Sequence, residues 1–128
     1  MKKKTDYSIG KFEEACSRLR EGTQMAKDEL GKDGVIQRFE FTFELLWKTL
    51  KVYLETEKGI QSQSPRDALK NGFSAGIIKD ETICLQMLED RNKTAHLYDK
   101  AESEKIYQNI KTKYLDFFAD ILETLKSK

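Results

Sequence analysis

The sequence predicts an all-α protein, an up-and-down four-helix bundle with one additional short helix. Apolar residues recur every three or four positions along most of the 128 residues, which is the period of one helix face. A single proline and seven glycines leave few positions for the turns of a sandwich or barrel. A chain of this length fits one domain around one core, so residues 1–128 are expected to form a single helical domain.

Two long helices joined by a short link are expected first. Gly31 and Gly34 are expected to end the first helix, and Asp33 is the expected N-cap of the second, which Gly59 closes. Because the link is short, the two helices should pack antiparallel as a hairpin. The apolar face of the first consists of Phe12, Cys16, Leu19, Thr23, Ala26 and Leu30. The stronger stripe of the second consists of Ile36, Phe39, Phe43, Leu46, Trp47, Leu50, Tyr53 and Leu54.

The segment "SPRDALKNG" predicts the short helix. Ser64 is the expected N-cap, Pro65 suits the first helical position, and Asp67 completes a capping-box pattern. The pair Asn71–Gly72 is expected to end it.

Two more helices complete the predicted bundle. Asp80 is the expected N-cap of a helix that runs through Cys84, Leu88 and the segment "RNKTAHLYD", residues 91–99. Asp99 and Glu102 offer another capping box, which starts the last helix. The apolar stripe of this last helix consists of Ile106, Ile110, Tyr114, Phe117, Ile121 and Leu125.

Composition excludes several functional classes. The formal net charge is +1 and no basic stripe is visible, which argues against a dedicated duplex-DNA binder. The lysine run at positions 2–4 is typical of a solvated terminus, so any contact with nucleic acid should be local. Cys16 and Cys84 lack CxxC spacing and are expected in the core. With one histidine in the chain, we expect no metal site and no cofactor.

The sequence also bears on location. No apolar run approaches the roughly 18 residues that a membrane-spanning helix needs. The start "MKKKTDYSIGKF" has a lysine run but no apolar segment after it, so it does not resemble a secretory signal. A cytoplasmic protein without membrane contact is expected.

The segment "RNKTAHLYD" places ionisable groups where the helical pattern is apolar. If the helix continues at 100° per residue, Arg91 and Tyr98 lie inside the apolar stripe, and Asn92 and His96 stack along its edge. A guanidinium that is buried without a partner would cost several kcal/mol. An arginine at this position therefore needs a compensating partner.

Three explanations are compatible with the spacing. Arg91 pairs with an internal carboxylate, Glu40 or Glu44, and His96 is a hydrogen-bonded core residue. Alternatively, the stripe is a subunit interface in which Arg91 meets a partner chain. In the third, the cluster lines a cleft and binds an anion such as phosphate.

Three blocks of the chain resemble one known family. Arg91-Asn92-x-x-x-His96 matches the R-polar-x(3)-H signature of the HEPN superfamily (higher eukaryotes and prokaryotes nucleotide-binding), and Tyr98 fits the RxxxxHxY form. The segments "IQRFEFTFELLWKTLK", "SPRDALKNGFSAGII" and "EDRNKTAHLYD" resemble, in this order, the nucleotidyltransferase substrate-binding proteins. This resemblance covers nearly the whole chain and is more specific than the RxxxxH pattern.

The resemblance implies a HEPN-type bundle, usually a homodimer whose two motifs face one another. It also implies a minimal nucleotidyltransferase, encoded nearby, that forms a complex with the chain. Toxins of this family are metal-independent RNases, and their partner silences them by adding AMP to the motif tyrosine. Arg91 and His96 are then the catalytic candidates, Asn92 their supporting polar residue, and Tyr98 the modification site.

The chemistry of these residue types fits RNA cleavage. An imidazole with an unperturbed pKa of about 6.5 transfers protons near neutral pH, and a guanidinium stabilises charge on a phosphoryl group. Two facing motifs in a twofold dimer would supply both an acid and a base, and their shared cleft would accommodate Arg91. The alternative function is a non-catalytic subunit that binds nucleotide or substrate for the nucleotidyltransferase. A plain structural bundle is the third interpretation.

Overall fold

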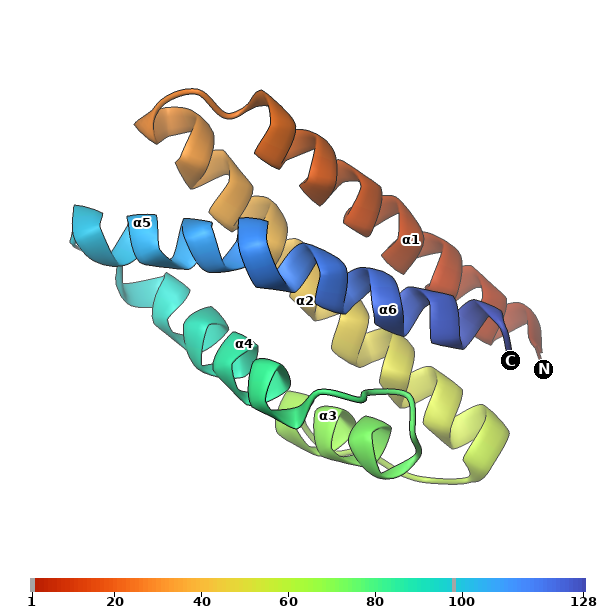
Figure 1. The fold of residues 1–128 in the computed structure, drawn as a ribbon. Coiled ribbons are helices and arrows are strands. Elements are labelled where there is room, and N and C mark those ends of the chain that lie inside the picture. The colour runs from red at the N-terminus through yellow and green to blue at the C-terminus, as the bar shows by residue number, and fades with distance from the viewer. Residues whose placement is uncertain (1, 98) are drawn as a thin grey trace.

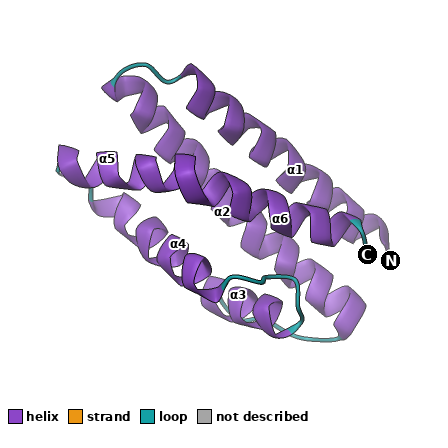
Figure 2. Cartoon of the chain, viewed as in Figure 1, coloured by secondary structure: helices purple, strands orange, loops and turns teal. Residues whose placement is uncertain are grey.

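The chain folds as a bundle of helices, as the sequence predicts. The computed structural model describes residues 2–97 and 99–128, and this part of the chain contains no strand. The α-helices are labelled in Figures 1 and 2. In chain order the elements are α1 (Lys2–Met25), α2 (Glu29–Lys58), α3 (Pro65–Ser74), α4 (Glu81–Lys93), the 3-10 turn η1 (Thr94–His96), α5 (Lys100–Asn109), the π-helical turn η2 (Ile110–Tyr114) and α6 (Leu115–Lys126). Because α5, η2 and α6 follow one another without a gap, they act as the fourth long helix of the bundle.

Helices α1 and α2 form the expected antiparallel hairpin, but the turn lies earlier than the sequence predicted (Figure 1). Asp28, rather than Asp33, caps α2: its Oδ1 accepts from the Gly31 amide at 2.8 Å. Gly31 and Gly34 lie inside α2, and Leu30, which was expected in the core, is 80% exposed. The period could not locate the turn, because Leu30 continues the spacing of the first helix beyond its end.

Glycine at position 31 serves close packing instead of helix termination. A Cβ there would lie 3.1 Å from Ala26 Cα, in the segment that links the two helices. The link can therefore double back tightly onto the first turn of α2.

Helix α3 starts as predicted and ends later. The Ser64 hydroxyl accepts from the Asp67 amide at 3.1 Å, while the Asp67 carboxylate accepts from Gln63, one residue before the expected donor. The helix continues past Asn71–Gly72 to Ser74. Gly72 is buried, and a Cβ there would lie 3.2 Å from Ile78 Cδ1, so this glycine permits close packing within the helix.

The predicted caps of α4 and α5 are confirmed. Asp80 Oδ1 accepts from the Ile83 amide at 3.0 Å, and Asp99 Oδ1 accepts from the Ala101 amide at 2.9 Å. Glu102, the other half of the expected capping box, lies in the first turn of α5. An acidic side chain there is favourable, because it faces the positive end of the helix dipole.

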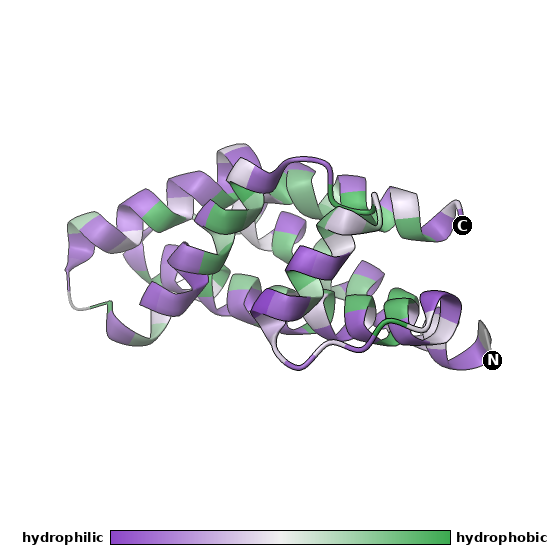
Figure 3. Cartoon of the chain, turned by 90° about the horizontal axis from the view of Figure 1, so that it is seen from below, coloured by the Kyte–Doolittle hydropathy of each residue, from purple (hydrophilic) through white to green (hydrophobic). Residues whose placement is uncertain are grey.

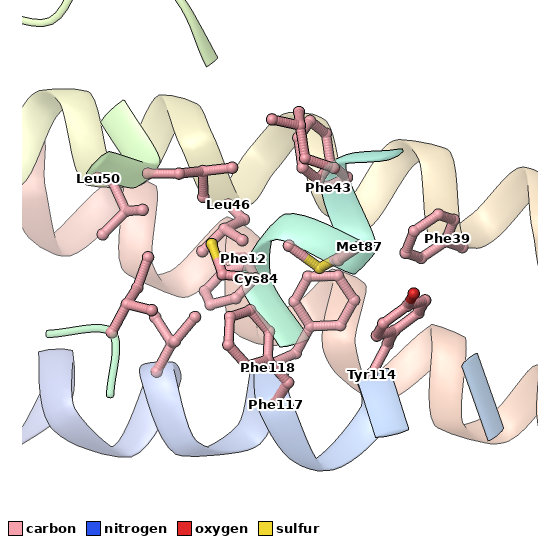
Figure 4. Close-up of a cluster of buried hydrophobic side chains, with 14 of the residues drawn as sticks. Phe12, Phe39, Phe43, Leu46, Leu50, Cys84, Met87, Tyr114, Phe117 and Phe118 are labelled. Atoms are coloured by element: carbon pink, nitrogen blue, oxygen red, sulfur yellow. The ribbon is translucent and has the colours of Figure 1, made fainter. Parts of the chain in front are cut away.

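One aromatic core joins the long helices. Phe12 of α1 meets Phe118 of α6 edge to face at 6.0 Å, and Phe39 of α2 stacks on Tyr114 of η2 at 5.5 Å. Figure 4 shows these rings together with Met87 and Cys84 of α4. Apolar residues gather on the inward faces of the helices and polar ones outside (Figure 3).

The two cysteines are core residues, as expected. Cys84 is buried and Cys16 partly buried, and both are reduced. Burial raises the pKa of the Cys16 thiol to about 12 and that of Cys84 to about 11, which keeps both thiols protonated at neutral pH.

No helix within the described residues is long and apolar enough to cross a membrane.

Candidate active site at the end of α4

The α-helix ends inside the candidate motif. Arg91 and Asn92 lie on the last turn of α4, which stops at Lys93, and His96 ends the 3-10 turn. The Thr94 amide donates to the Arg91 carbonyl, which is the i to i+3 bond that tightens the chain. The expectation that one α-helix continues through His96, so that Asn92 and His96 stack along it, is therefore wrong. Tyr98 itself lies outside the described residues.

Thr94 lies where the helix type changes, and its hydroxyl contacts both the preceding turn and α2. Its hydroxyl lies 2.7 Å from the Arg91 carbonyl and 2.7 Å from Glu40 Oε2, so one proton serves two acceptors. A threonine hydroxyl that bonds nearby main chain competes with regular helix hydrogen bonding. The contact with Glu40 also attaches this turn to α2, because Glu40 belongs to that helix.

Arg91 pairs with Glu44, one of the two internal carboxylates considered from the sequence. Its Nη2 donates to Glu44 Oε1 at 3.1 Å, and the guanidinium lies 5.7 Å from the centre of the Phe43 ring. The arginine side chain remains 33% exposed, so the ion pair does not remove it from solvent. Arg91 is therefore oriented by α2 while part of its guanidinium group stays accessible.

The Arg91 environment is nearly balanced in charge. Lys48 Nζ lies 3.7 Å from the second oxygen of Glu44, so this carboxylate sits between two cations. Arg91 Nε is buried, and no hydrogen-bond acceptor among the described residues satisfies it. An anion such as a phosphoryl oxygen would find donors here, but it would have to approach beside Glu44.

Asn92 and His96 are both exposed, on either side of the point where α4 ends. The first alternative made His96 a core histidine, and its exposure rules that part out. The structure thus places Arg91, Asn92 and His96 on one short stretch of chain at one end of the bundle (Figure 1). An exposed imidazole is accessible to a ligand and can exchange protons with it.

Asp90 is a buried carboxylate that the sequence interpretation missed. It is 7% exposed, and its Oδ2 accepts from the Tyr114 hydroxyl at 2.6 Å and from Asn109 Nδ2 at 2.9 Å. Burial, together with the bond to Asp90, raises the pKa of Tyr114, which therefore remains a donor. The sequence does contain a signal for this buried carboxylate. Asp90 follows Met87 by three residues and so lies on the inward face of α4, where a carboxylate needs a hydrogen-bond partner.

Comparison with known proteins identifies the family. The family model for "nucleotidyltransferase substrate binding protein like" matches residues 7–127. A curated relative from Haemophilus influenzae, described as "Probable ribonuclease HepT", is 31% identical over 81 residues, which are 60% of this chain and 56% of the relative. The chain thus matches about half the length of that relative.

Two solved structures share the fold along nearly the whole chain. A protein from Thermus thermophilus matches with a TM-score of 0.76 and 29% identity, over 91% of this chain and 96% of that one. A Haemophilus influenzae protein, described as having the fold of a substrate-binding domain of a nucleotidyltransferase, matches with a TM-score of 0.66 and 25% identity, over 95% and 96% of the two chains. The chain belongs to the nucleotidyltransferase substrate-binding protein family, the HEPN-type family that its motif resembles.

Proposed function

We propose that this protein is a HEPN-type RNase toxin of the cytoplasm, controlled by a partner minimal nucleotidyltransferase that adds AMP to Tyr98. One observation carries the proposal: Arg91 is oriented by Glu44 yet remains 33% exposed, five residues before an exposed histidine. The exposed part of the guanidinium keeps N–H donors that the phosphoryl group of a ligand can reach. The relative described as a ribonuclease supports the same activity.

The proposed reaction is cleavage of RNA by its own 2′-hydroxyl. A base removes the 2′-hydroxyl proton, the 2′-oxygen attacks the phosphorus, and the 5′-oxygen leaves with a proton from an acid. His96 carries the proton transfer, because an imidazole can both accept and donate a proton. Arg91 stabilises the charge that grows on the phosphoryl oxygens, and Asn92 supports it with a polar contact.

The proposed reaction needs an acid and a base, which predicts a homodimer. The chain has one histidine, so two copies with facing motifs would supply two imidazoles. The apolar stripe of α4 does not itself support the dimer, because Cys84 and Leu88 are buried within a single chain. Light scattering at micromolar concentration should give twice the 14.9 kDa of one chain. A mass of one chain would contradict the dimer.

The proposed regulation is tested with the partner present. The purified chain should cleave RNA alone and lose this activity after incubation with the nucleotidyltransferase and ATP. AMP on Tyr98 would add a bulky anion next to the motif, which should compete with the RNA phosphate. Tyr98→Phe should retain cleavage, escape silencing and gain no AMP mass by intact-protein mass spectrometry.

A tyrosine elsewhere provides the control for that experiment. Tyr7→Phe removes an exposed hydroxyl from α1, so this variant should be modified and silenced like the wild type. If Tyr98→Phe gains the same AMP mass as the wild type, the modification site is assigned wrongly.

A second candidate function is a non-catalytic subunit that binds nucleotide or substrate for the nucleotidyltransferase. The observation that favours it is the Glu44–Arg91 ion pair, which neutralises the arginine before any ligand arrives. This alternative predicts no RNA cleavage by the purified chain, together with higher nucleotidyltransferase activity when the chain is added to its partner. The RNA assay with and without the partner therefore separates the two functions.

A further inference from the structure

The end of α4 separates the two proposed catalytic side chains. Arg91 is on regular α-helix, whereas His96 lies beyond Lys93 on the 3-10 turn. Helical spacing therefore does not fix the position of one relative to the other. Something outside α4 must hold both if their separation is to be constant.

Two carboxylates on α2 contact residues on the two sides of the end of α4. Glu44 accepts from Arg91 Nη2 at 3.1 Å, and Glu40 accepts from the Thr94 hydroxyl at 2.7 Å. Thr94 is the first residue of the turn that ends with His96. One carboxylate thus holds the arginine, and the other holds the segment that carries the histidine.

Helix α2 is a rigid support for this pair of contacts. Glu40 and Glu44 are four residues apart, which places them on one face about 6 Å apart along the helix axis. Their neighbours Phe39 and Phe43 are at most 1% exposed, so the helix is locked into the core at this point. The main chain that carries the two carboxylates is therefore held in place by the core.

We propose that Glu40 and Glu44 are positioning residues that set the separation of Arg91 from His96, with Thr94 as the link to Glu40. The proposal rests on the RNase function proposed above. It assigns neither glutamate a contact with RNA. Misplacement of reacting groups by about 1 Å can cost about 100-fold in rate, so loss of either contact should lower kcat more than it raises KM.

The main experiment compares two substitutions of Thr94. Thr94→Val keeps the shape and charge of the residue but removes the hydroxyl, and we expect kcat for RNA cleavage to fall by about 10- to 100-fold with KM nearly unchanged. Thr94→Ser keeps the hydroxyl and should retain most of the activity. The matched control is Thr124→Val, which removes a hydroxyl that bonds its own helix at Asp120 O, on α6.

The coupling between Thr94 and Glu40 is tested by combining substitutions. Glu40→Ala should lower kcat, and the double variant should lose little more than Thr94→Val alone, because Thr94→Val already removes the contact with Glu40. Additive losses would mean that they act separately and would overturn the link. For Glu44, the amide of Glu44→Gln keeps an acceptor for Arg91 and should preserve more activity than Glu44→Leu.

A spectroscopic measurement separates failure of this inference from failure of the proposed function. The chain has one histidine, so the imidazole gives a single set of NMR resonances that needs no cleavage assay. Thr94→Val and Glu40→Ala should shift these resonances, whereas Thr94→Ser and Thr124→Val should leave them near the wild-type positions.

The outcomes are distinct. If the wild type does not cleave RNA but the resonances shift as expected, the RNase function fails and the positioning role stands. If the wild type cleaves RNA while Thr94→Val keeps full kcat and unchanged resonances, the positioning role is overturned. Thermal unfolding of each variant identifies any that fails to fold, and the milder Glu44→Gln and Glu44→Leu pair then decides the role of α2.

Discussion

Substitution of His96 by alanine is expected to lower RNA cleavage by about 10²–10⁴-fold, because it removes the only imidazole available for proton transfer in each chain. The fold should remain intact, since His96 is exposed and lies on a short turn at the end of α4. Single-turnover cleavage of a labelled RNA measures the loss, and circular dichroism checks the helix content. Activity that persists in this variant would contradict the proposed mechanism.

Arg91→Ala should lower the rate by about 10²–10³-fold, because it removes a charge that stabilises the transition state. It should not unfold the chain: Glu44 is 35% exposed and keeps Lys48 at 3.7 Å, so the remaining carboxylate is solvated. Arg66→Ala is the matched control, since it removes an equal charge from an exposed position on another helix, α3. RNA cleavage by the wild type should be unaffected by EDTA, because proton transfer by His96 and charge stabilisation by Arg91 need no metal. Cleavage that requires Mg²⁺ would contradict this chemistry.

Tyr114→Phe is expected to lower the free energy of unfolding markedly, although it removes only one hydroxyl group. The hydroxyl donates to the buried Asp90 carboxylate at 2.6 Å, and a hydrogen bond to a charged group contributes about 1.5–3 kcal/mol. Without it, Asp90 would keep Asn109 as a donor but would remain buried. Urea unfolding followed by circular dichroism measures the change in the free energy of unfolding.

The control for Tyr114→Phe is Tyr107→Phe, which removes a hydroxyl from another buried tyrosine, one that does not bond to Asp90. It should cost clearly less stability than Tyr114→Phe. Equal losses in the two variants would mean that the bond to Asp90 contributes little. Because burial and Asp90 raise the pKa of Tyr114, this contribution is complete below the ordinary tyrosine pKa of about 10 and declines as the pH rises above it.

Local interactions explain why much of the fold could be predicted. Ser64, Asp80 and Asp99 each accept a hydrogen bond from an amide two or three residues away, so each cap is visible in a short stretch of sequence. The three- and four-residue period located the long helices for the same reason. The α1–α2 link was placed too late because the period of the first helix continues through Leu30 by coincidence, while the true cap is Asp28.

The sequence by itself determined the all-α class, the N-caps of α3, α4 and α5, and the family, because each depends on residues close together in the chain or on a motif. It also identified Arg91 as a residue that needs a partner, and named Glu40 and Glu44 as candidates. Only the tertiary structure decided that Glu44 pairs with Arg91, that Glu40 holds Thr94 and that α4 ends between Arg91 and His96. The physical reason is distance along the chain: these contacts join residues 47 and 54 positions apart, so only the packing of α4 against α2 brings them together.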